Sequence, residues 1–101
     1  MKWYKVCEVD EIPVMGARTV RYNGLEAGIF RLSDGRIKAV ENRCPHKDGP
    51  LSEGIVSGET VICPMHGLKI SLIDGSALPP DEGSVKTYEI KTEGEKVWIM
   101  F

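Results

Sequence analysis

Residues 41–67 read ENRCPHKDGPLSEGIVSGETVICPMHG, a stretch that holds both histidines of the protein and two of its three cysteines. The four side chains form two groups, Cys44-Pro45-His46 and Cys63-Pro64-Met65-His66. The pattern is therefore Cys-x-His, sixteen residues, then Cys-x-x-His. One thiolate and one neutral imidazole from each group make a complete set of four ligands for a borderline or soft metal.

Two short strand candidates, Ile55–Ser57 and Thr60–Ile62, lie between the two groups. They are rich in β-branched residues and flank Gly58-Glu59, which predicts a hairpin. The segments on either side, 42–50 and 63–67, are rich in Pro, Gly, Cys and His and are typical of loops. The hairpin would bring the two loops together.

The spacing discriminates between metals. A mononuclear zinc site usually takes one pair of ligands from two Cys and the other from two His, with at least two residues within each pair. Here each loop is mixed, and one residue separates Cys44 from His46. A [2Fe-2S] centre explains mixed loops better, because each loop can send its Cys to one iron and its His to the other. Structural zinc remains the alternative.

Turn signals divide the rest of the chain into short alternating segments. Asn23-Gly24 and Asp34-Gly35 separate the segments 19–22, 25–32 and 36–40, and both dipeptides tolerate the positive φ of tight hairpins. A third hairpin is expected from Tyr88 to Phe101, with its turn at residues 92–95. We therefore expect an all-β fold, an antiparallel sandwich or barrel.

Helical periodicity does not extend over the ten or more residues that a helix needs. Val9 and Ile12 are spaced for a single turn at most, which Pro13 would end. Cys7 lies in a strand-like segment without a ligand partner nearby, so we expect it to be buried as a small apolar residue.

Length and charge exclude several classes of protein. A chain of 101 residues has room for one domain, and no apolar run approaches the roughly 20 residues of a membrane span. Thirteen basic against fifteen acidic residues, with no basic block, argue against nucleic acid as a partner. The first residues lack the apolar core of a signal peptide, which favours a cytoplasmic location. Three cysteines then suit metal binding better than a disulfide framework.

The two ligand groups resemble those of Rieske-type [2Fe-2S] domains, and the resemblance extends over nearly the whole chain. It implies one domain, 1–101, with a small cluster-binding part at about 42–81 inserted in a larger β part. It also implies that Cys44 and Cys63 bind the buried iron and that His46 and His66 bind the outer one. Leu78-Pro79-Pro80 would be the loop that covers the cluster, and Gly67 would let the backbone approach an inorganic sulfur.

The sequence departs from the high-potential members of this family at two pairs of positions. Gly49 and Met65 stand where those members carry a pair of disulfide-bonded cysteines. Leu68 and Ile70 stand where they carry a Ser and a Tyr that donate hydrogen bonds to the sulfurs. Fewer donors stabilise the added electron less, so we expect a low reduction potential.

Residues 41–59 are most similar to the small subunit of assimilatory NAD(P)H nitrite reductase. This implies electron transfer beside a large subunit that carries flavin, an iron–sulfur cluster and sirohaem. The alternative is a ferredoxin that donates electrons to an aromatic-ring-hydroxylating oxygenase. A structural zinc or ligand-free interaction domain is the alternative of another class. In each case the chain alone lacks the motifs of an enzyme, and catalysis would belong to a partner.

Overall fold

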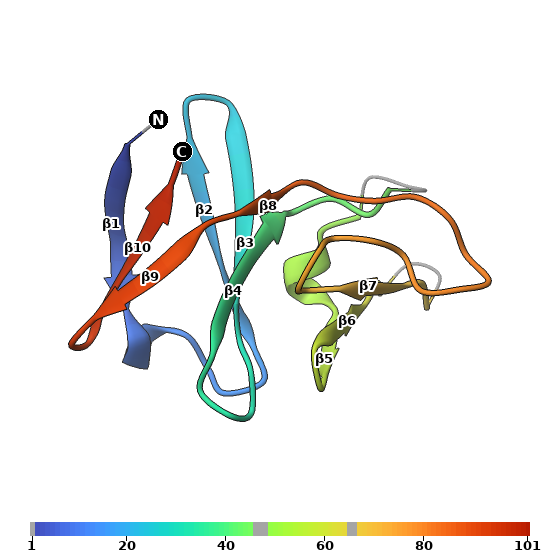
Figure 1. Cartoon of the computed structure of the whole chain (residues 1–101), viewed down its shortest axis with the longest axis horizontal. Coiled ribbons are helices and arrows are strands. Elements are labelled where there is room, and N and C mark those ends of the chain that lie inside the picture. The colour runs from blue at the N-terminus through green and yellow to red at the C-terminus, as the bar shows by residue number, and fades with distance from the viewer. Residues whose placement is uncertain (1, 46–48, 65–66) are drawn as a thin grey trace.

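The computed structural model describes residues 2–45, 49–64 and 67–101, so His46 and His66 lie outside the described residues. Within these ranges the chain forms ten strands in three antiparallel sheets and two single-turn 3₁₀ helices. The expected all-β, antiparallel fold is therefore confirmed. Figure 1 shows the three sheets side by side along the long axis of a molecule that measures 38 × 29 × 18 Å.

The first two sheets each combine strands that are neighbours in the chain with one distant strand, and the third consists of consecutive strands. The first sheet contains β1 (Trp3–Glu8), β10 (Lys96–Met100) and β9 (Ile90–Glu93), in that order. The second contains β2 (Ala17–Tyr22), β3 (Leu25–Arg31), β4 (Ile37–Glu41) and β8 (Thr87–Tyr88). The third contains β5 (Ile55–Ser57), β6 (Thr60–Ile62) and β7 (Lys69–Ser71). The 3₁₀ helices are η1 (Val9–Glu11) and η2 (Leu51–Glu53).

The turns form where the sequence predicts them. Asn23 and Gly24 have φ values of 50° and 83°, so the β2–β3 hairpin uses the left-handed conformation that this dipeptide tolerates. The β3–β4 turn likewise contains Gly35 at φ 95°. The β5–β6 hairpin has the predicted bounds, and η1 is the single turn expected before Pro13.

The third expected hairpin is correct from Ile90 onward and wrong for Tyr88. Tyr88 lies in β8 and pairs with Ala39 of the second sheet, whereas Ile90 lies in β9 and pairs with Ile99 of the first. The chain therefore passes from one sheet to the other at Glu89, and Figure 1 shows this crossing beside β4. Alternation of apolar residues continues through the crossing, so the sequence pattern does not reveal it.

The first two sheets enclose one apolar core. Its buried members come from β1, β3, β4, β10 and the residue that follows η1: Cys7, Ile12, Ala27, Ile29, Ile37, Ala39, Val97 and Ile99. Cys7 is 4% exposed, which confirms its expected burial, and no disulfide joins the three cysteines of the chain. A row of rings also links the two sheets, with Tyr4 and Tyr22 4.5 Å apart and Tyr22 and Phe101 5.2 Å apart between ring centroids.

The third sheet lies at the end of the molecule away from the first sheet (Figure 1). Its strands come between β4 and β8 in the sequence, and β4 and β8 are themselves paired neighbours. The insertion therefore leaves and rejoins the second sheet at one place, where Glu41 N donates to Lys86 O over 2.7 Å.

The chain ends are also paired. Lys2 N donates to Phe101 O over 2.9 Å, and Phe101 N donates to Lys2 O over 3.1 Å. Among the described residues, no helix is long and apolar enough to cross a membrane.

Candidate functional site

Cys44 and Cys63 each begin a loop whose backbone returns to the cysteine. Cys44 follows β4, and its N–H donates to Gly49 O over 2.9 Å. Cys63 follows β6, and its N–H donates to Leu68 O over 2.7 Å while its carbonyl accepts from Gly67 N over 3.0 Å. These closures give both cysteines a fixed backbone at the base of a loop.

The two cysteines share one enclosed apolar environment. Each is 1% exposed, and both belong to the second core cluster. That cluster also contains residues of β3, β4, η2, the third sheet and the adjoining loops, namely Phe30, Leu32, Val40, Leu51, Val56, Val61, Leu68, Ile70, Leu72 and Val85. The two cysteines of the sequence motif are therefore buried in one apolar core.

This environment fits a metal cluster by the chemistry of its donors. A buried thiolate is unfavourable in apolar surroundings unless a cation lies beside it, and bound metal ions hold coordinating thiols deprotonated. The described residues contain no group of three or more His, Cys, Asp or Glu side chains that could hold a metal ion. His46 and His66, the other two predicted ligands, lie outside the described residues, so the complete set of four stays a prediction.

The positions that follow the second loop carry no side-chain donor. Leu68 is 4% exposed and Ile70 is fully buried, and both pack in the same core cluster as Cys63. A hydroxyl at either position would face the core rather than water. The two positions at which the sequence lacks a hydroxyl, Leu68 and Ile70, are therefore buried in the same cluster as Cys63.

Gly67 has φ 71°, in the left-handed region that favours glycine. A Cβ built at this residue would meet no atom of the described residues within 4 Å. The backbone conformation, rather than crowding by the described residues, is thus the physical reason for glycine here. A close approach of its backbone to sulfide stays a prediction.

The segment Leu78-Pro79-Pro80 lies beside β7, the strand that follows the second loop. Leu78 N donates to Lys69 O over 2.9 Å, and Ala77 forms an isolated bridge with Ile70. Pro79 and Pro80 are exposed. The segment is therefore held next to the strand that carries Ile70, and its covering of the cluster stays a prediction.

Sequence reasoning missed Asn42 as a site residue and placed it only at the start of the first loop. Its side chain is buried, at 7% exposure, two residues before Cys44. Position 42 continues the inward alternation of Val40, which is the signal that could have indicated its burial. A polar side chain at an inward position next to a ligand motif needs partners, and these are described below.

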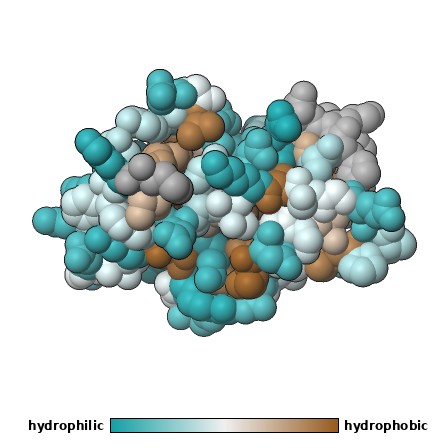
Figure 2. All heavy atoms as spheres, turned by 45° about the horizontal axis from the view of Figure 1, so that its top comes forward, coloured by the Kyte–Doolittle hydropathy of each residue, from teal (hydrophilic) through white to brown (hydrophobic). Residues whose placement is uncertain are grey.

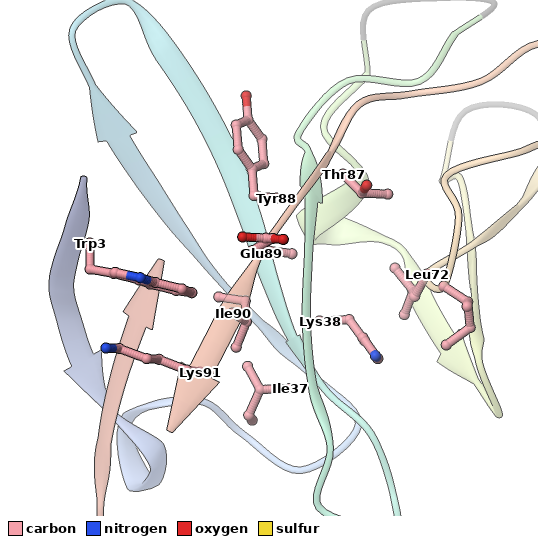
Figure 3. Close-up of a pocket in the computed structure, with 11 residues that line it drawn as sticks. Trp3, Ile37, Lys38, Leu72, Thr87, Tyr88, Glu89, Ile90 and Lys91 are labelled. Carbon is pink, nitrogen blue, oxygen red and sulfur yellow. The ribbon is translucent and has the colours of Figure 1, made fainter. Parts of the chain in front are cut away.

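A groove of about 540 Å³ lies between β4 and β9. Figure 3 shows its lining, with Trp3, Ile90 and Lys91 on one side and Leu72 on the other. Lys91 Nζ lies 4.7 Å from the ring centroid of Trp3. Among the described residues of the two cysteine loops, none lines this groove.

The view in Figure 2 shows hydrophobic residues as separate patches among hydrophilic ones. Exposed apolar side chains include Val14, Ile55 and Ile73. Single exposed apolar side chains are normal on protein surfaces, and they do not by themselves mark an interface.

An all-β fold with two cysteines buried in one apolar core, each following a strand, defines a small β protein with paired buried thiols. A family model described as the Rieske [2Fe-2S] domain matches residues 2–89, and the chain belongs to this family. Its cofactor is a Rieske-type [2Fe-2S] cluster, and its general function is electron transfer.

Three similar proteins illustrate the range of the family. The ferredoxin component of the naphthalene 1,2-dioxygenase system of Pseudomonas aeruginosa is 32% identical over 97% of this chain and 94% of that protein. A putative NADH-dependent nitrite reductase small subunit from Mycobacterium tuberculosis has a TM-score of 0.88 at 28% identity, covering 97% of this chain and 93% of that one. The third match is a chain of the complex of reduced oxygenase and oxidised ferredoxin in carbazole 1,9a-dioxygenase. It has a TM-score of 0.86 at 26% identity, covering 96% and 91% of the two chains.

Proposed function

We propose that this chain is a one-electron carrier of the ferredoxin type, which supplies the oxygenase component of a multicomponent oxygenase system. The observation that carries the carrier role is the pair of cysteines, each 1% exposed in one apolar core at the bases of two loops. The choice of partner is supported by a relative from a dioxygenase system that matches over nearly the full length of both chains.

The proposed ligands are Cys44 and Cys63 for the buried iron and His46 and His66 for the outer iron. When bound, the cluster takes up and releases one electron. The apolar core around the cysteines excludes water from the thiolates, and the closed loop backbones hold them in place. Leu68 and Ile70 offer no side-chain hydrogen bond, which supports a low potential within the Rieske range.

The second candidate is the small subunit of an NAD(P)H nitrite reductase. It is favoured by the structural match to the nitrite reductase small subunit and by the similarity of residues 41–59 to such subunits. In that arrangement the chain would exchange electrons beside a large flavin and sirohaem subunit. A cytoplasmic location stays a prediction in both cases, as does the division into a cluster-binding part at about 42–81 within one domain.

The test compares the two partners directly. The holoprotein, reduced under anaerobic conditions, is mixed in a stopped-flow instrument with the oxidised oxygenase component of a dioxygenase system or with a sirohaem nitrite reductase subunit. We expect fast, saturable reoxidation by the oxygenase component and slow reoxidation by the sirohaem subunit. The reverse order would assign the chain to nitrite reduction. Stoichiometric zinc without iron or acid-labile sulfide would contradict both candidates.

A further inference from the structure

Asn42 is a buried polar side chain at the base of the first cysteine loop. It is 7% exposed and comes directly after β4 and two residues before Cys44. Burying a carboxamide without partners is costly, so its contacts decide what it does.

The carboxamide of Asn42 binds Ser52 at both of its ends. Its Oδ1 accepts from Ser52 N over 2.7 Å, and its Nδ2 donates to Ser52 Oγ over 3.0 Å. Ser52 lies in η2, directly after the loop that Cys44 begins. One side chain therefore joins the two ends of this loop, outside the inner closure from Cys44 N to Gly49 O.

The same carboxamide also binds the second sheet. Asn42 Nδ2 donates to Glu26 Oε2 of β3 over 2.8 Å, and Asn42 N donates to Glu26 O over 3.0 Å. Arg21 Nε donates to the other carboxylate oxygen of Glu26 over 2.8 Å, which orients this carboxylate toward Asn42. The first loop is thus tied to β3 through Asn42.

The sheet leaves space for this arrangement. A Cβ added at Gly28 of β3 would lie 3.0 Å from the Phe30 ring and 3.4 Å from Asn42 Oδ1. The glycine therefore keeps the ring and the carboxamide side by side. A side chain here would displace one of them.

We propose that Asn42 is a positioning residue for the cluster: its carboxamide fixes the Cys44 loop against β3, and so sets where the Cys44 ligand stands. The proposal rests on the proposed role of Cys44 as a ligand. It predicts that Asn42 affects how tightly the cluster is held and its spectroscopic properties, in addition to any effect on stability.

A second connection between the same two parts of the molecule provides a matched control. Arg36, in the β3–β4 turn, binds Asp34 with its Nε over 2.7 Å and Glu59 of the β5–β6 turn with its second guanidinium nitrogen over 2.6 Å. Like the Asn42 contacts, this pair joins the second sheet to the segment between β4 and β8. Unlike them, it involves no residue of a cysteine loop.

Three variants separate the contacts of Asn42. Asn42→Asp keeps the acceptor for Ser52 N but turns a carboxylate oxygen toward the carboxylate of Glu26, where two acceptors of like charge oppose each other. Glu26→Gln alone leaves a carbonyl that still accepts from Asn42. Combining Asn42→Asp with Glu26→Gln restores a donor and an acceptor in reversed order.

The measurements are iron and acid-labile sulfide content, the rate of cluster loss to a chelator, and the EPR g values of the reduced holoprotein. We expect Asn42→Asp to lose its cluster about tenfold faster than the wild type, with shifted g values. Glu26→Gln and the control Glu59→Gln should stay within about twofold of the wild type, and the double variant should return to that range.

An Asn42→Asp protein that melts at a lower temperature but has wild-type g values and cluster loss would overturn the positioning role. So would a double variant that is no better than Asn42→Asp. If Asn42→Asp alone yields no folded protein, recovery of loaded protein on adding Glu26→Gln supports the proposal, and no recovery overturns it. A wild-type protein without iron and sulfide, or a Cys44→Ser variant that keeps its cluster, would instead show that the ligand assignment itself is wrong.

Discussion

At the scale of single residues, the two buried cysteines of the loops differ from Cys7 in what surrounds them. Cys44 and Cys63 lie in the core cluster beneath the loops, whereas Cys7 lies in the core between the first two sheets. We expect Cys44→Ser or Cys63→Ser to abolish the cluster, because a serine oxygen is a poor replacement for a thiolate on iron. Cys7→Ser is the control, and iron and sulfide analysis is the measurement. Loss of iron from the Cys7 variant alone would contradict the assignment.

Cys7 should instead affect stability at alkaline pH. Burial raises the pKa of the Cys7 thiol, with smaller opposing effects from nearby charges such as Arg18. A raised pKa means that the folded state binds this proton more tightly than the unfolded state. The resulting stabilisation is complete below the ordinary thiol pKa and is lost as the pH rises through the folded-state pKa.

Urea unfolding at pH 8 and pH 10 measures this effect. The free energy of unfolding should fall more between these pH values in the wild type than in Cys7→Ala, which has no thiol to ionise. Equal falls in both proteins would exclude a contribution from Cys7.

Leu68 allows a test of the low potential. We expect a wild-type midpoint nearer to about −150 mV than to +300 mV. Leu68→Ser should raise it, because a hydroxyl beside the second loop can stabilise the added electron through a hydrogen bond. Leu68→Ala removes the same bulk without adding a donor and should leave the potential nearly unchanged. A native midpoint above roughly +100 mV would show that other groups supply the donors.

At the scale of secondary-structure elements, the residue that ends η2, Gly54, packs closely against β6. A Cβ at Gly54 would collide with Ile62 O and lie 3.0 Å from a methyl carbon of Val61. We expect Gly54→Ala to lower the free energy of unfolding by about 3 kcal/mol, because the backbone of β6 would have to move.

Gly58→Ala, in the turn of the β5–β6 hairpin, is the matched control. Gly58 has φ 58°, but an added Cβ would meet no atom within 4 Å, so the substitution should cost only about 1 kcal/mol of backbone strain. Chemical denaturation of both holoproteins measures the difference. A Gly58→Ala protein that is the less stable of the two would contradict the packing argument.

The elements differ in how well their sequences predict them. β2 to β6 were predictable because Asn-Gly, Asp-Gly and Gly-Glu turns separate alternating or β-branched runs. β7 was not predictable, because its three residues form a strand through their pairing with β6. In this pairing Ile70 of β7 lies opposite Val61 of β6. The change of sheet at Glu89 is likewise set by pairing, because β8 pairs with the distant β4 and β9 pairs with β10.

The sequence points to candidate ligands but not to the residues that support them, and the ligand assignment stays a prediction. Cys44 and Cys63 stand out by residue type and spacing alone. The contacts of Asn42 depend on Glu26 and Ser52, which approach only when β3 and η2 pack together. No local pattern encodes such an encounter between segments far apart in the chain.

At the scale of the whole molecule, the third sheet and the first sheet occupy opposite ends (Figure 1). If electrons leave through the cluster end, a charge placed there should slow transfer, and the same charge change at the other end should not. We expect Pro80→Asp to slow reoxidation by the partner while leaving the visible spectrum unchanged. Lys96→Gln in β10 changes the net charge by the same amount and should have little effect. Slower transfer in the Lys96 variant alone would place the docking surface on the first sheet.

The hydrogen bonds between Lys2 and Phe101 have a consequence for engineering. Because residues 2 and 101 are adjacent, a short linker could join them and the backbone could be opened elsewhere, for example at the Asn23-Gly24 turn. Such a circular permutant should retain its pairing of β1 with β10. For the same reason residues 2–101 could be inserted into a surface loop of a host protein without separating the two ends of that loop.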